Sequence, residues 1–488
     1  MEASKYYFGK SSKDLSLAEA SLLAGIPQSP NNYSPVKNYN LSKERQKIVL
    51  KLMLNNKKIT KEEYEEALNT ELKIIGKKED SNYISINYFR DSVLEELKTI
   101  TEVPASTIET GGLKIYTTLD ATAQKSLEDS VYSYINDDTK IETAAIMMDP
   151  NTGEVLALIG GNNYSKSQFN RATKAKRQVG STMKPLLYYS ALESGFTSSS
   201  SFTSEKTTFT FSGGKSYSPK NYNDRYAEGP LSMEAAIAYS DNIYAVKTHL
   251  FLGENNLINT AKRLGITSNL SEVPSLALGT SEISLIEMTS AYSCFASLGY
   301  KTTPHFIKKI EDSKGNILYE NKEEKELLLN PSLTYILNEM LTSTYNKNFI
   351  NYNYPTLISL LPQITHKYAI KSGTTDTDLL IMGYNKNVVL GVWNGYDNNT
   401  KIDSSEYSHH KNIWIDTMES YFKQKEASWY EIPNNVVGVL TEPITGALAT
   451  DETQNKEMFF YLKGTEPSAE SNYKDLEAVF QEENNSNT

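Results

Sequence analysis

Apolar, strand-like runs at two distant places in the chain constrain its fold more than any other feature. The first, AAIMMDPNTGEVLALIGG at residues 144–161, has two apolar stretches around the turn Asp149 to Gly153, which predicts a β-hairpin. The second has three such stretches within residues 367–397, KYAIKSGTT, LLIMGYNKN and VVLGVWNGYD, which predict an antiparallel meander. Helical patterns occupy roughly residues 231–300 between them. We therefore expect an α+β fold that mixes helices and strands.

The composition limits the class of protein. A chain of 488 residues is too long for one ordinary domain, and at roughly 150 residues per domain it should form about three. Apolar residues make up 39% and charged residues 22%, which permits a packed core and excludes global disorder. The 49 basic and 60 acidic side chains give a net charge of -11, which argues against a general nucleic-acid binder. We recognise neither an apolar run of the ~18–20 residues that span a membrane nor a signal peptide.

Changes of pattern divide the chain into segments. Ser16 and Glu19 have the spacing of a capping box, so the first segment reads as helical. We expect the Ser-rich residues 197–229 to form an irregular surface segment, and most of the 33 tyrosines to keep their hydroxyl in water. The predicted segments are a helical part at 1–55, a connector at 56–140, a main domain at 141–430, a small β-rich piece at 431–470 and a disordered acidic tail at 471–488.

Neither a metal site nor a cofactor is predicted. The single cysteine, Cys294, excludes a disulfide framework and a zinc site with several cysteines, and its apolar helical surroundings predict a buried core residue. His409 and His410 are adjacent, so they do not face one point on regular structure, and we expect them in a solvated loop. The other histidines are dispersed along the chain.

The first motif with chemistry is GSTMKP, in which Ser181 and Lys184 lie three residues apart at the start of a predicted helix. This spacing brings both side chains to one face. A serine hydroxyl is a poor nucleophile until a base takes its proton, and a lysine serves as that base if burial disfavours its charged form. Backbone N–H groups at the helix start can stabilise an oxyanion. Alone the motif is weak, because a capping serine and a solvated lysine are the commoner explanation of Ser-x-x-Lys in a chain of this length.

Two further motifs follow. Ser240-Asp241-Asn242 comes after a helical pattern; its serine could relay a proton, and its asparagine amide could hold a peptide bond with a donor and an acceptor. Lys371-Ser372-Gly373-Thr374 ends a strand pattern, offering a positive charge, a close backbone approach and an edge to which an extended peptide could add. Each could also be a polar helix break or an ordinary strand end.

The ordered set of three motifs is far more specific than any one of them. With its flanks it resembles a class A penicillin-binding protein, in RQVGSTMKP, in SPKNYNDRYAEGPLSMEAAIAYSDN, in SLALGTSEISLIEMTSAYSCFASLG, and in ITGALAT and FFYLKGTEPS near the end. The resemblance covers nearly the whole chain and is most specific over residues 143–396. It implies a penicillin-binding, serine β-lactamase-like transpeptidase domain at 141–430, with an antiparallel sheet flanked by helices.

Carried over by position, the resemblance implies a D,D-transpeptidase that cross-links peptidoglycan stem peptides through a serine acyl-enzyme. Ser181 would attack the penultimate D-Ala carbonyl with Lys184 as base, and Ser240 and Lys371 would relay a proton to the leaving group. The implied substrate-binding residues are Asn242, Ser372, Gly373 and Thr374. Asn242 would orient the acyl donor, Thr374 would bind the substrate carboxylate, and the N–H groups of Ser181 and Thr374 would form the oxyanion hole. Ser372 replaces the family's usual threonine but keeps the hydroxyl, so we expect modest effects on substrate or drug preference.

The implied partners are the stem-peptide donor, an amine acceptor and β-lactams, which would acylate Ser181 as substrate mimics. The segment YFGKSSKDLSLAEASLLAGIPQSPNNYSP resembles the last part of the family's glycosyltransferase domain, whose essential glutamates and membrane anchor lie further upstream. We therefore expect a chain truncated within that domain and lacking glycan polymerisation, with a structural role for Glu19. Its parent protein would be anchored at the outer face of the bacterial cytoplasmic membrane and would work in cell-wall synthesis complexes.

Two alternatives remain open. The first is a hydrolase, either a D,D-carboxypeptidase or a β-lactamase, and ENNLIN superficially offers the deacylating glutamate that the latter needs. However, Glu254 follows Ser240 too closely and Ile258 stands where an asparagine is expected, so a helix start explains it better. The second is a non-catalytic remnant that binds the cell wall or division partners.

Overall fold

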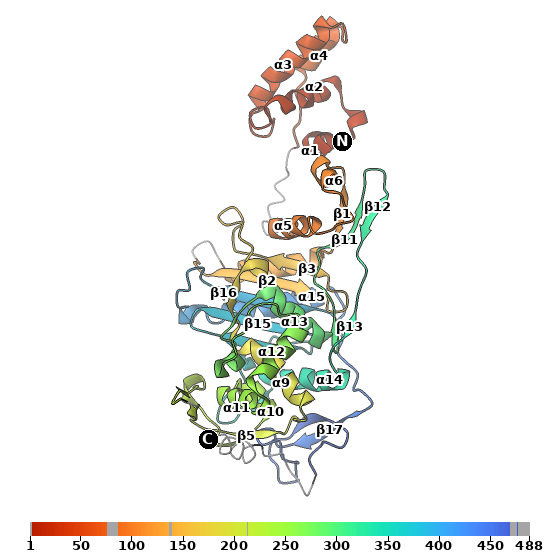
Figure 1. The fold of residues 1–488 in the computed structure, drawn as a ribbon. Coiled ribbons are helices and arrows are strands. Elements are labelled where there is room, and N and C mark those ends of the chain that lie inside the picture. Colours follow the sequence, from red (N-terminus) through yellow and green to blue (C-terminus); the bar gives the residue numbers. More distant parts are fainter. Residues whose placement is uncertain (1, 76–85, 136–138, 212, 469–475, 477–488) are drawn as a thin grey trace. The chain divides into compact units, whose positions relative to one another are not determined.

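The computed structural model describes residues 2–75, 86–135, 139–211, 213–468 and 476 (Figure 1). These residues belong to two compact units, 1–84 and 85–488, whose boundary falls inside the segment expected to be a connector. The predicted tail lies outside the described residues except for Leu476, which is buried and whose N–H donates to Ser201 O at 2.9 Å.

The first unit is helical, as predicted. Its helices are α1 (Glu2–Phe8), α2 (Leu17–Gly25), α3 (Tyr39–Asn55) and α4 (Lys61–Asn69). The capping box is present, since Glu19 N donates to Ser16 Oγ at 3.2 Å and Ser16 N donates to Glu19 Oε2 at 2.8 Å. Glu19 also pairs with Lys10 at 2.7 Å, so its carboxylate has the structural role that the sequence predicts. The buried core of this unit consists of Phe8, Ala18, Leu22, Leu50, Ala67 and Leu72.

A five-stranded antiparallel sheet organises the second unit and confirms the α+β fold (Figure 1). Its strands, in spatial order, are β14 (Ala369–Thr374), β15 (Asp378–Tyr384), β16 (Val389–Gly395), β2 (Glu142–Met148) and β3 (Val155–Ile159). The predicted hairpin and the predicted meander are both confirmed. They join through β16 and β2, in which Trp393 pairs with Ala144. Strands more than 200 residues apart in sequence therefore become neighbours, and β14 becomes an edge strand.

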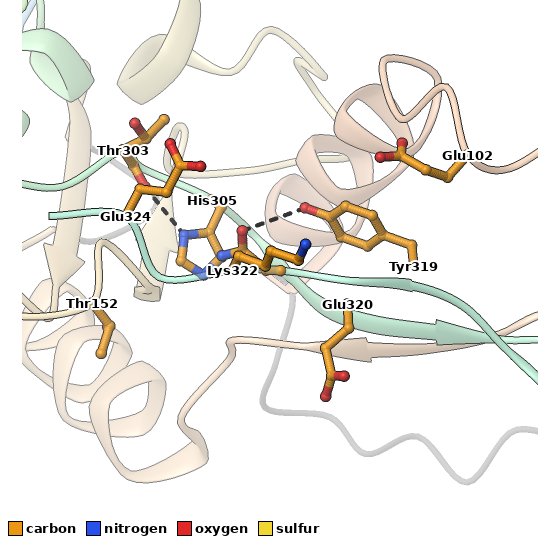
Figure 2. Close-up of a pocket in the computed structure, with 9 residues that line it drawn as sticks. Glu102, Thr152, Thr303, His305, Tyr319, Glu320, Lys322 and Glu324 are labelled. Atoms are coloured by element: carbon orange, nitrogen blue, oxygen red, sulfur yellow. Dashed lines mark hydrogen bonds between the residues drawn. The ribbon is translucent and has the colours of Figure 1, made fainter.

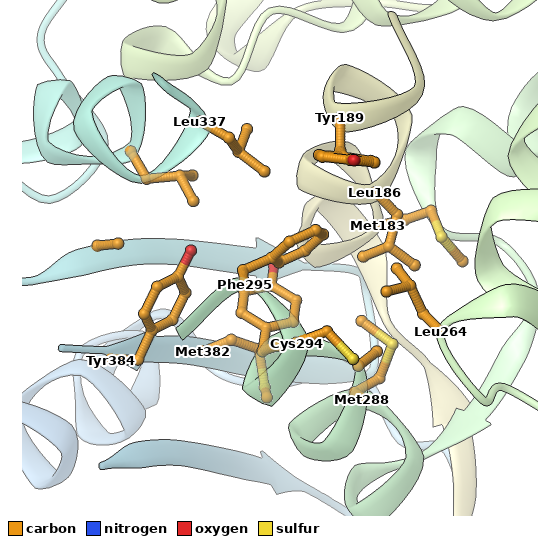
Figure 3. Close-up of a cluster of buried hydrophobic side chains, with 14 of the residues drawn as sticks. Met183, Leu186, Tyr189, Leu264, Met288, Cys294, Phe295, Leu337, Met382 and Tyr384 are labelled. Carbon is orange, nitrogen blue, oxygen red and sulfur yellow. The ribbon is translucent and has the colours of Figure 1, made fainter. Parts of the chain in front are cut away.

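Both faces of this sheet are buried, which explains why its strands read as continuous apolar runs. In β2, Ala145 and Met147 belong to the cluster on one face, whereas Ile146 and Met148 belong to the other. Helices α7 (Ala121–Tyr134) and α15 (His409–Phe422) pack on the first face. On the second face, α9 (Lys184–Glu193) and α13 (Leu285–Ala296) meet the sheet in a sulfur-rich core (Figure 3). Cys294 is buried in this core, as predicted. Figure 3 also shows Met183, Leu186, Met288, Phe295, Met382 and Tyr384 there.

The remaining elements extend this unit. The other helices are α5 (Ile86–Leu97), α6 (Ala105–Thr110), α8 (Arg171–Lys174), α10 (Met233–Tyr239), α11 (Asn242–Leu252), α12 (Glu254–Arg263) and α14 (Pro331–Met340). The smaller sheets are β1 (Lys114–Thr117), β11 (Ile307–Glu311) and β12 (Ile317–Glu320); β4 (Lys176–Gln178) with β9 (Glu282–Ser284); β5 (Ser201–Ser204) with β8 (Gly229–Ser232); β6 (Phe209–Thr210) with β7 (Ser216–Tyr217); β10 (Tyr300–Lys301) with β13 (Glu326–Leu327); and β17 (Val436–Thr441) with β18 (Glu457–Leu462).

The expectation of an irregular surface segment at 197–229 is wrong for its first part. Ser198 to Ser201 and Phe202 are buried, and β5 pairs with β8. The serines are small and polar, so the sequence suggests solvent, but their hydroxyls are satisfied internally. Ser199 Oγ donates to Gly446 O at 2.6 Å, and a β-carbon at Gly446 would lie 2.7 Å from Ser199 Oγ. Small residues here allow close packing against the C-terminal piece.

The expectation for His410 is corrected, and the expectation for the tyrosines has exceptions. His410 is fully buried in the first turn of α15, not in a solvated loop, and burial lowers the pKa of its imidazole well below its usual value. Many tyrosines are also buried with their hydroxyl bonded inside the protein. Tyr292 donates to Thr182 O at 2.7 Å and Tyr244 donates to Ser200 O at 2.7 Å. A buried hydroxyl with a carbonyl partner does not need water.

Glu287 on α13 should make stability depend on pH. Burial alone would raise its pKa, but hydrogen bonds from Ser268, Ser284 and Thr267 outweigh burial and lower the pKa to about 2. A depressed carboxylate pKa stabilises the fold above the unfolded value and loses this contribution as the pH falls toward 2. Glu287→Gln should lower the free energy of unfolding by about 1–2 kcal/mol at pH 7, after allowance for its partial exposure. Urea unfolding at pH 7 and pH 3 checks this, and an equal loss at both values would contradict it.

Candidate active site

Ser181 lies in a short 3₁₀ turn, Gly180–Met183, that leads directly into α9. Gly180 has φ of 55°, and its N–H donates to Gly279 O at 3.1 Å. Thr182 Oγ1 donates to Val179 O at 2.6 Å. Met183 inserts into the core below (Figure 3). The nucleophile candidate therefore stands on a turn that is fixed from both sides, as the helix-start prediction requires.

Lys184 follows one turn later and is completely buried. Its Nζ donates to Ser240 O at 2.7 Å, Ser240 Oγ at 3.2 Å, Asp241 O at 3.1 Å and Asn242 Oδ1 at 2.7 Å. Burial lowers the pKa of its ammonium from 10.5 to about 7, and the Asp241 carboxylate offsets part of this effect. Near neutral pH this lysine is therefore present in both its charged and its neutral form.

The second motif occupies the sharp junction between α10 and α11. Ser240 adopts a left-handed conformation, with φ of 55° and ψ of 46°, which is uncommon for a residue other than glycine. Asp241 caps α11, since Tyr244 N donates to its Oδ1 at 2.8 Å. This turn directs the Ser240 hydroxyl between two lysines, because Lys371 Nζ donates to Ser240 Oγ at 2.9 Å. The three sequence motifs thus meet at one hydroxyl.

The third motif lies on the edge strand β14. Lys371 is completely buried, and its pKa lies well below its ordinary value, first because of burial and then because of the charges of Lys184 and Lys411. Ser372 is buried and its carbonyl accepts from Lys371 Nζ at 2.8 Å, whereas Thr374 is exposed. The structure brings Lys184, Ser240 and Lys371 into one hydrogen-bonded network. Ser181 Oγ makes no hydrogen bond to the described part of the chain.

Close backbone approach places Thr374 beside Ser181. A β-carbon at Gly180 would lie 3.1 Å from Thr374 N, and one at Gly373 would lie 2.4 Å from Val179 O. Thr375 N donates to Asp378 O, so the alternation of an antiparallel pair directs the Thr374 N–H away from β15, toward the free edge. The turn that carries Ser181 faces this edge. The two N–H groups implied for the oxyanion hole therefore belong to adjoining segments.

Asn221, which no sequence motif indicates, holds the second motif in place. Its Oδ1 accepts from Asn242 N at 2.7 Å and its Nδ2 donates to Asp241 Oδ2 at 2.6 Å. Asn242 Nδ2 in turn donates to Lys220 O at 2.6 Å. No local pattern distinguishes Asn221 from other loop asparagines, so only the tertiary structure reveals this role. Asp241, in contrast, could have been singled out as the middle residue of the motif.

A charged network around Asp378 was also missed, and it holds the turn that follows Thr374. Arg177 Nε donates to Asp378 Oδ1 at 2.7 Å, and Trp393 Nε1 donates to the same oxygen at 2.9 Å. Thr377 Oγ1 donates to Asp378 Oδ2 at 2.7 Å. The guanidinium of Arg177 lies over the Trp393 ring, 5.1 Å from its centroid. These contacts connect β4 to the strand end that presents Thr374.

Three further observations concern metal binding, membrane spans and Glu254. Across the described ranges, no three His, Cys, Asp or Glu side chains are grouped so that they could hold a metal ion. Within the same ranges, no helix is both long and apolar enough to cross a membrane. Glu254 is the first residue of α12, which confirms the interpretation as a helix start.

Comparison with known proteins identifies the family. The penicillin binding protein transpeptidase domain matches residues 143–402, and the transglycosylase family matches residues 1–54. Penicillin-binding protein 2D of Bacillus subtilis is 41% identical over 468 residues, which cover 96% of this chain and 68% of that protein. Penicillin-binding protein 1A of Aquifex aeolicus is 31% identical over 558 residues, covering 95% of this chain and 74% of that protein. The crystal structure of penicillin-binding protein 1A from Haemophilus influenzae has the same fold, with a TM-score of 0.78, 23% identity, and coverage of 96% of this chain and 88% of that one.

The chain therefore belongs to the penicillin-binding proteins, with homologues in class A, a transpeptidase domain and a transglycosylase match at its N-terminal end. Members of this family are serine enzymes that act on peptidoglycan and bind β-lactams, and they belong to the machinery of cell-wall synthesis.

Proposed function

We propose that this chain is a D,D-transpeptidase that cross-links peptidoglycan stem peptides through an acyl-enzyme on Ser181. The observation that carries the proposal is the buried network in which the Nζ atoms of Lys184 and Lys371 both donate to Ser240 Oγ, at 3.2 Å and 2.9 Å. Such a network moves a proton among three groups without involving bulk water. Membership of a peptidoglycan-acting serine family supports the same reaction type.

In the first half-reaction, Ser181 Oγ attacks the penultimate D-Ala carbonyl and its proton passes to neutral Lys184. The N–H groups of Ser181 and Thr374 stabilise the oxyanion of the tetrahedral intermediate. The carbon–nitrogen bond then breaks, and the terminal D-Ala leaves as an amine with a proton relayed through Ser240 from the lysine pair. The lowered pKa values of Lys184 and Lys371 favour such a relay, since each buried lysine releases a proton more readily than an exposed lysine does.

In the second half-reaction, an amine of a neighbouring stem peptide attacks the acyl-enzyme and the relay runs in reverse. The cross-link forms and the hydroxyl of Ser181 regains its proton. Asn242 is suited to orient the acyl donor because its amide is held by Lys184 Nζ and by Lys220 O. Its Oδ1 and Nδ2 each retain one further hydrogen-bonding position for a substrate peptide. Thr374, exposed at the strand end, is placed to bind the substrate carboxylate.

We further propose that β-lactams acylate Ser181 as substrate mimics and that the enzyme works at the outer face of the bacterial cytoplasmic membrane, where its substrate lies. A related structure, that of PonA1 from Mycobacterium tuberculosis in complex with penicillin V, shares this fold with a TM-score of 0.60 at 22% identity. The structural match covers 71% of this chain and 96% of the PonA1 chain.

Ser181→Ala should abolish covalent labelling by a fluorescent penicillin, because the variant lacks the attacking oxygen. Labelled protein is measured by gel fluorescence after denaturation, with circular dichroism to confirm the fold. Ser190→Ala is a matched control on α9, the helix that follows the Ser181 turn, since Ser190 is buried and its Oγ donates to Leu187 O at 2.8 Å. We expect that control to label like the wild type. An unlabelled wild type, or equal labelling of the Ser181 variant, would contradict the proposal.

The hydrolase alternatives are less well supported. The β-lactamase alternative depends on Glu254, which is separated from Asn242 by the whole of α11, a helix of 11 residues and hence about 16 Å. A D,D-carboxypeptidase would use the same acyl-enzyme but water as acceptor. Mass spectrometry of products from a pentapeptide substrate with an added amine distinguishes them: cross-linked peptide supports the transpeptidase, and tetrapeptide alone supports the carboxypeptidase. Rapid nitrocefin turnover would instead indicate a β-lactamase.

A further inference from the structure

A cavity of about 390 Å³ lies in the second unit, outside the network around Ser240 (Figure 2). Three segments form it: the loop between α5 and α6, which carries Glu102; the turn of the β2–β3 hairpin; and residues 303–324. An isolated bridge between Glu154 and His305 ties the last two together. The cavity adjoins β3, whereas Lys371 lies on β14 at the opposite edge of the sheet. Four strand spacings separate these edges, or roughly 19 Å.

Hydrogen-bond acceptors dominate the lining of this cavity. Glu102, Glu320 and Glu324 contribute carboxylates, against one cationic side chain, Lys322. Lys322 makes no ion pair with any described residue. Tyr319 OH donates to Asn321 Oδ1 at 3.4 Å, which leaves its oxygen free to accept. Burial raises the pKa of the Tyr319 hydroxyl, and the charges of Glu96 and Glu102 raise it further, which marks a negative potential here.

His305 is the buried member of the lining. Only 9% of its surface is exposed, and its Nδ1 lies 3.1 Å from Thr303 O. A carbonyl only accepts, so Nδ1 donates to it, and in the tautomer that matches this hydrogen bond Nε2 presents a lone pair. Nε2 has no partner among the described residues. Figure 2 shows the imidazole near the middle of the residues drawn, with the Tyr319 hydroxyl directed toward the same place. This buried acceptor indicates a donor ligand independently of the carboxylates.

A ligand for such a cavity should carry hydrogen-bond donors, a positive charge and no acceptor at the bound end. An ammonium group meets these requirements, because it has three donors and no lone pair. The residues do not form a group that could hold a metal ion, and this favours an organic cation. A volume of about 390 Å³ also fits an amino-acid side chain with part of its peptide better than a bare ion.

We propose that this cavity is a second binding site, for the primary ammonium group of an amine-bearing peptidoglycan peptide. The choice of a peptidoglycan peptide rests on the proposed transpeptidase, whose acceptor is an amine on a stem peptide. A glycan strand held here by one peptide presents its other peptides to Ser181 at a raised effective concentration. The site therefore retains the substrate strand, and the reacting atoms stay at the network around Ser240.

The first test measures binding of Nα-acetyl-lysine methylamide to the full chain by NMR titration. Glu320→Gln combined with Glu324→Gln should weaken this binding at least tenfold. Glu323→Gln combined with Glu326→Gln removes the same charge from neighbouring residues that do not line the cavity, and it should have no effect. The Nε-acetylated probe should not bind. Equal losses in both double variants, binding of the acetylated probe, or displacement by benzylpenicillin would each overturn the proposal. The assay needs no reaction at Ser181, so it can fail or succeed independently of the proposed function.

The second test identifies the source of the ammonium group by co-sedimentation with isolated cell-wall sacculi. Chemical acetylation of the free amines of the sacculi should lower the fraction of wild-type protein that sediments at least threefold. The Glu320→Gln, Glu324→Gln variant should sediment equally with both preparations. If this variant shows the same drop as the wild type, or if the wild type is insensitive to acetylation while still binding the lysine probe, peptidoglycan is not the ligand and the proposal is wrong.

Discussion

Lys184→Met should lower the rate at which a fluorescent penicillin acylates Ser181 about a thousandfold, the loss expected when a general base is removed. Methionine has similar length and suits a buried position, but it cannot accept a proton. Lys247→Met is a matched control, because Lys247 is also buried and its Nζ donates to Thr203 O at 2.9 Å, outside the network around Ser240. We expect that control to react within about threefold of the wild type. Stopped-flow or time-resolved gel fluorescence gives both rates.

The pH dependence of the wild type tests the same role without a substitution. Lysine accepts a proton only when neutral, and burial lowers the pKa of Lys184 to about 7. The acylation rate should therefore rise about tenfold per pH unit below 7 and become constant above it. A lysine with the usual pKa of about 10.4 would be neutral in only about one molecule in 2,500 at pH 7. A flat profile between pH 5.5 and 8.5, or a Lys184 variant with the wild-type rate, would exclude Lys184 as the base.

Gly279→Ala should slow acylation about a hundredfold by displacing the turn that carries Ser181. A β-carbon at Gly279 would lie 2.0 Å from Gly180 O and 2.6 Å from Gly180 N, and neither backbone atom can yield without moving the turn. A misplacement of about 1 Å between reacting groups costs roughly this factor. The variant should still fold, because the clash affects one loop and leaves the sheet and its two cores unchanged.

Gly253→Ala separates this displacement from backbone strain. Gly253 has φ of 81°, close to the 73° of Gly279, but nothing lies within 4 Å of its β-carbon position. Alanine is strained at both positions, at Gly279 with ψ of 38° and at Gly253 with ψ of 135°, but only Gly279→Ala adds the clash. We expect both substitutions to lower the melting temperature and Gly279→Ala alone to slow acylation. Equal acylation rates in the two variants would show that the contact between Gly180 and Gly279 does not position Ser181.

The strands of the five-stranded sheet were predictable because they are apolar runs bounded by turn residues, and the hairpin at 144–161 and the meander at 367–397 both occur. Helix starts were predictable where a capping pattern is local, as at Ser16 and Glu19. The buried serines from Ser198 to Ser201 and the buried His410 were not predictable from pattern. A sequence pattern predicts that polar residues are exposed. In the interior their hydrogen bonds are supplied by partners from distant parts of the chain, which the local pattern does not show.

At the site, too, the sequence indicated the residue types and the tertiary structure gave their contacts. Ser181, Lys184, Ser240 and Lys371 were singled out as candidates from their types and order in the sequence. Their hydrogen bonds were not, since the contacts between Lys184, Ser240 and Lys371 depend on how α9, α11 and β14 pack. Asn221 and Asp378 hold these elements in place and have no signal in local sequence.

By itself the sequence determined the local elements, the residue types available for chemistry and the family to which the chain belongs. The tertiary structure decided three further properties: that β16 pairs with β2, that Lys184 and Lys371 are buried around one serine hydroxyl, and that the Ser181 turn adjoins Thr374. The physical reason is that hydrogen-bonding periodicity and turn preferences act over a few residues, whereas desolvation depends on every segment that packs around a group. The pKa of Lys184 is lowered in this protein because distant parts of the chain exclude water from its ammonium group.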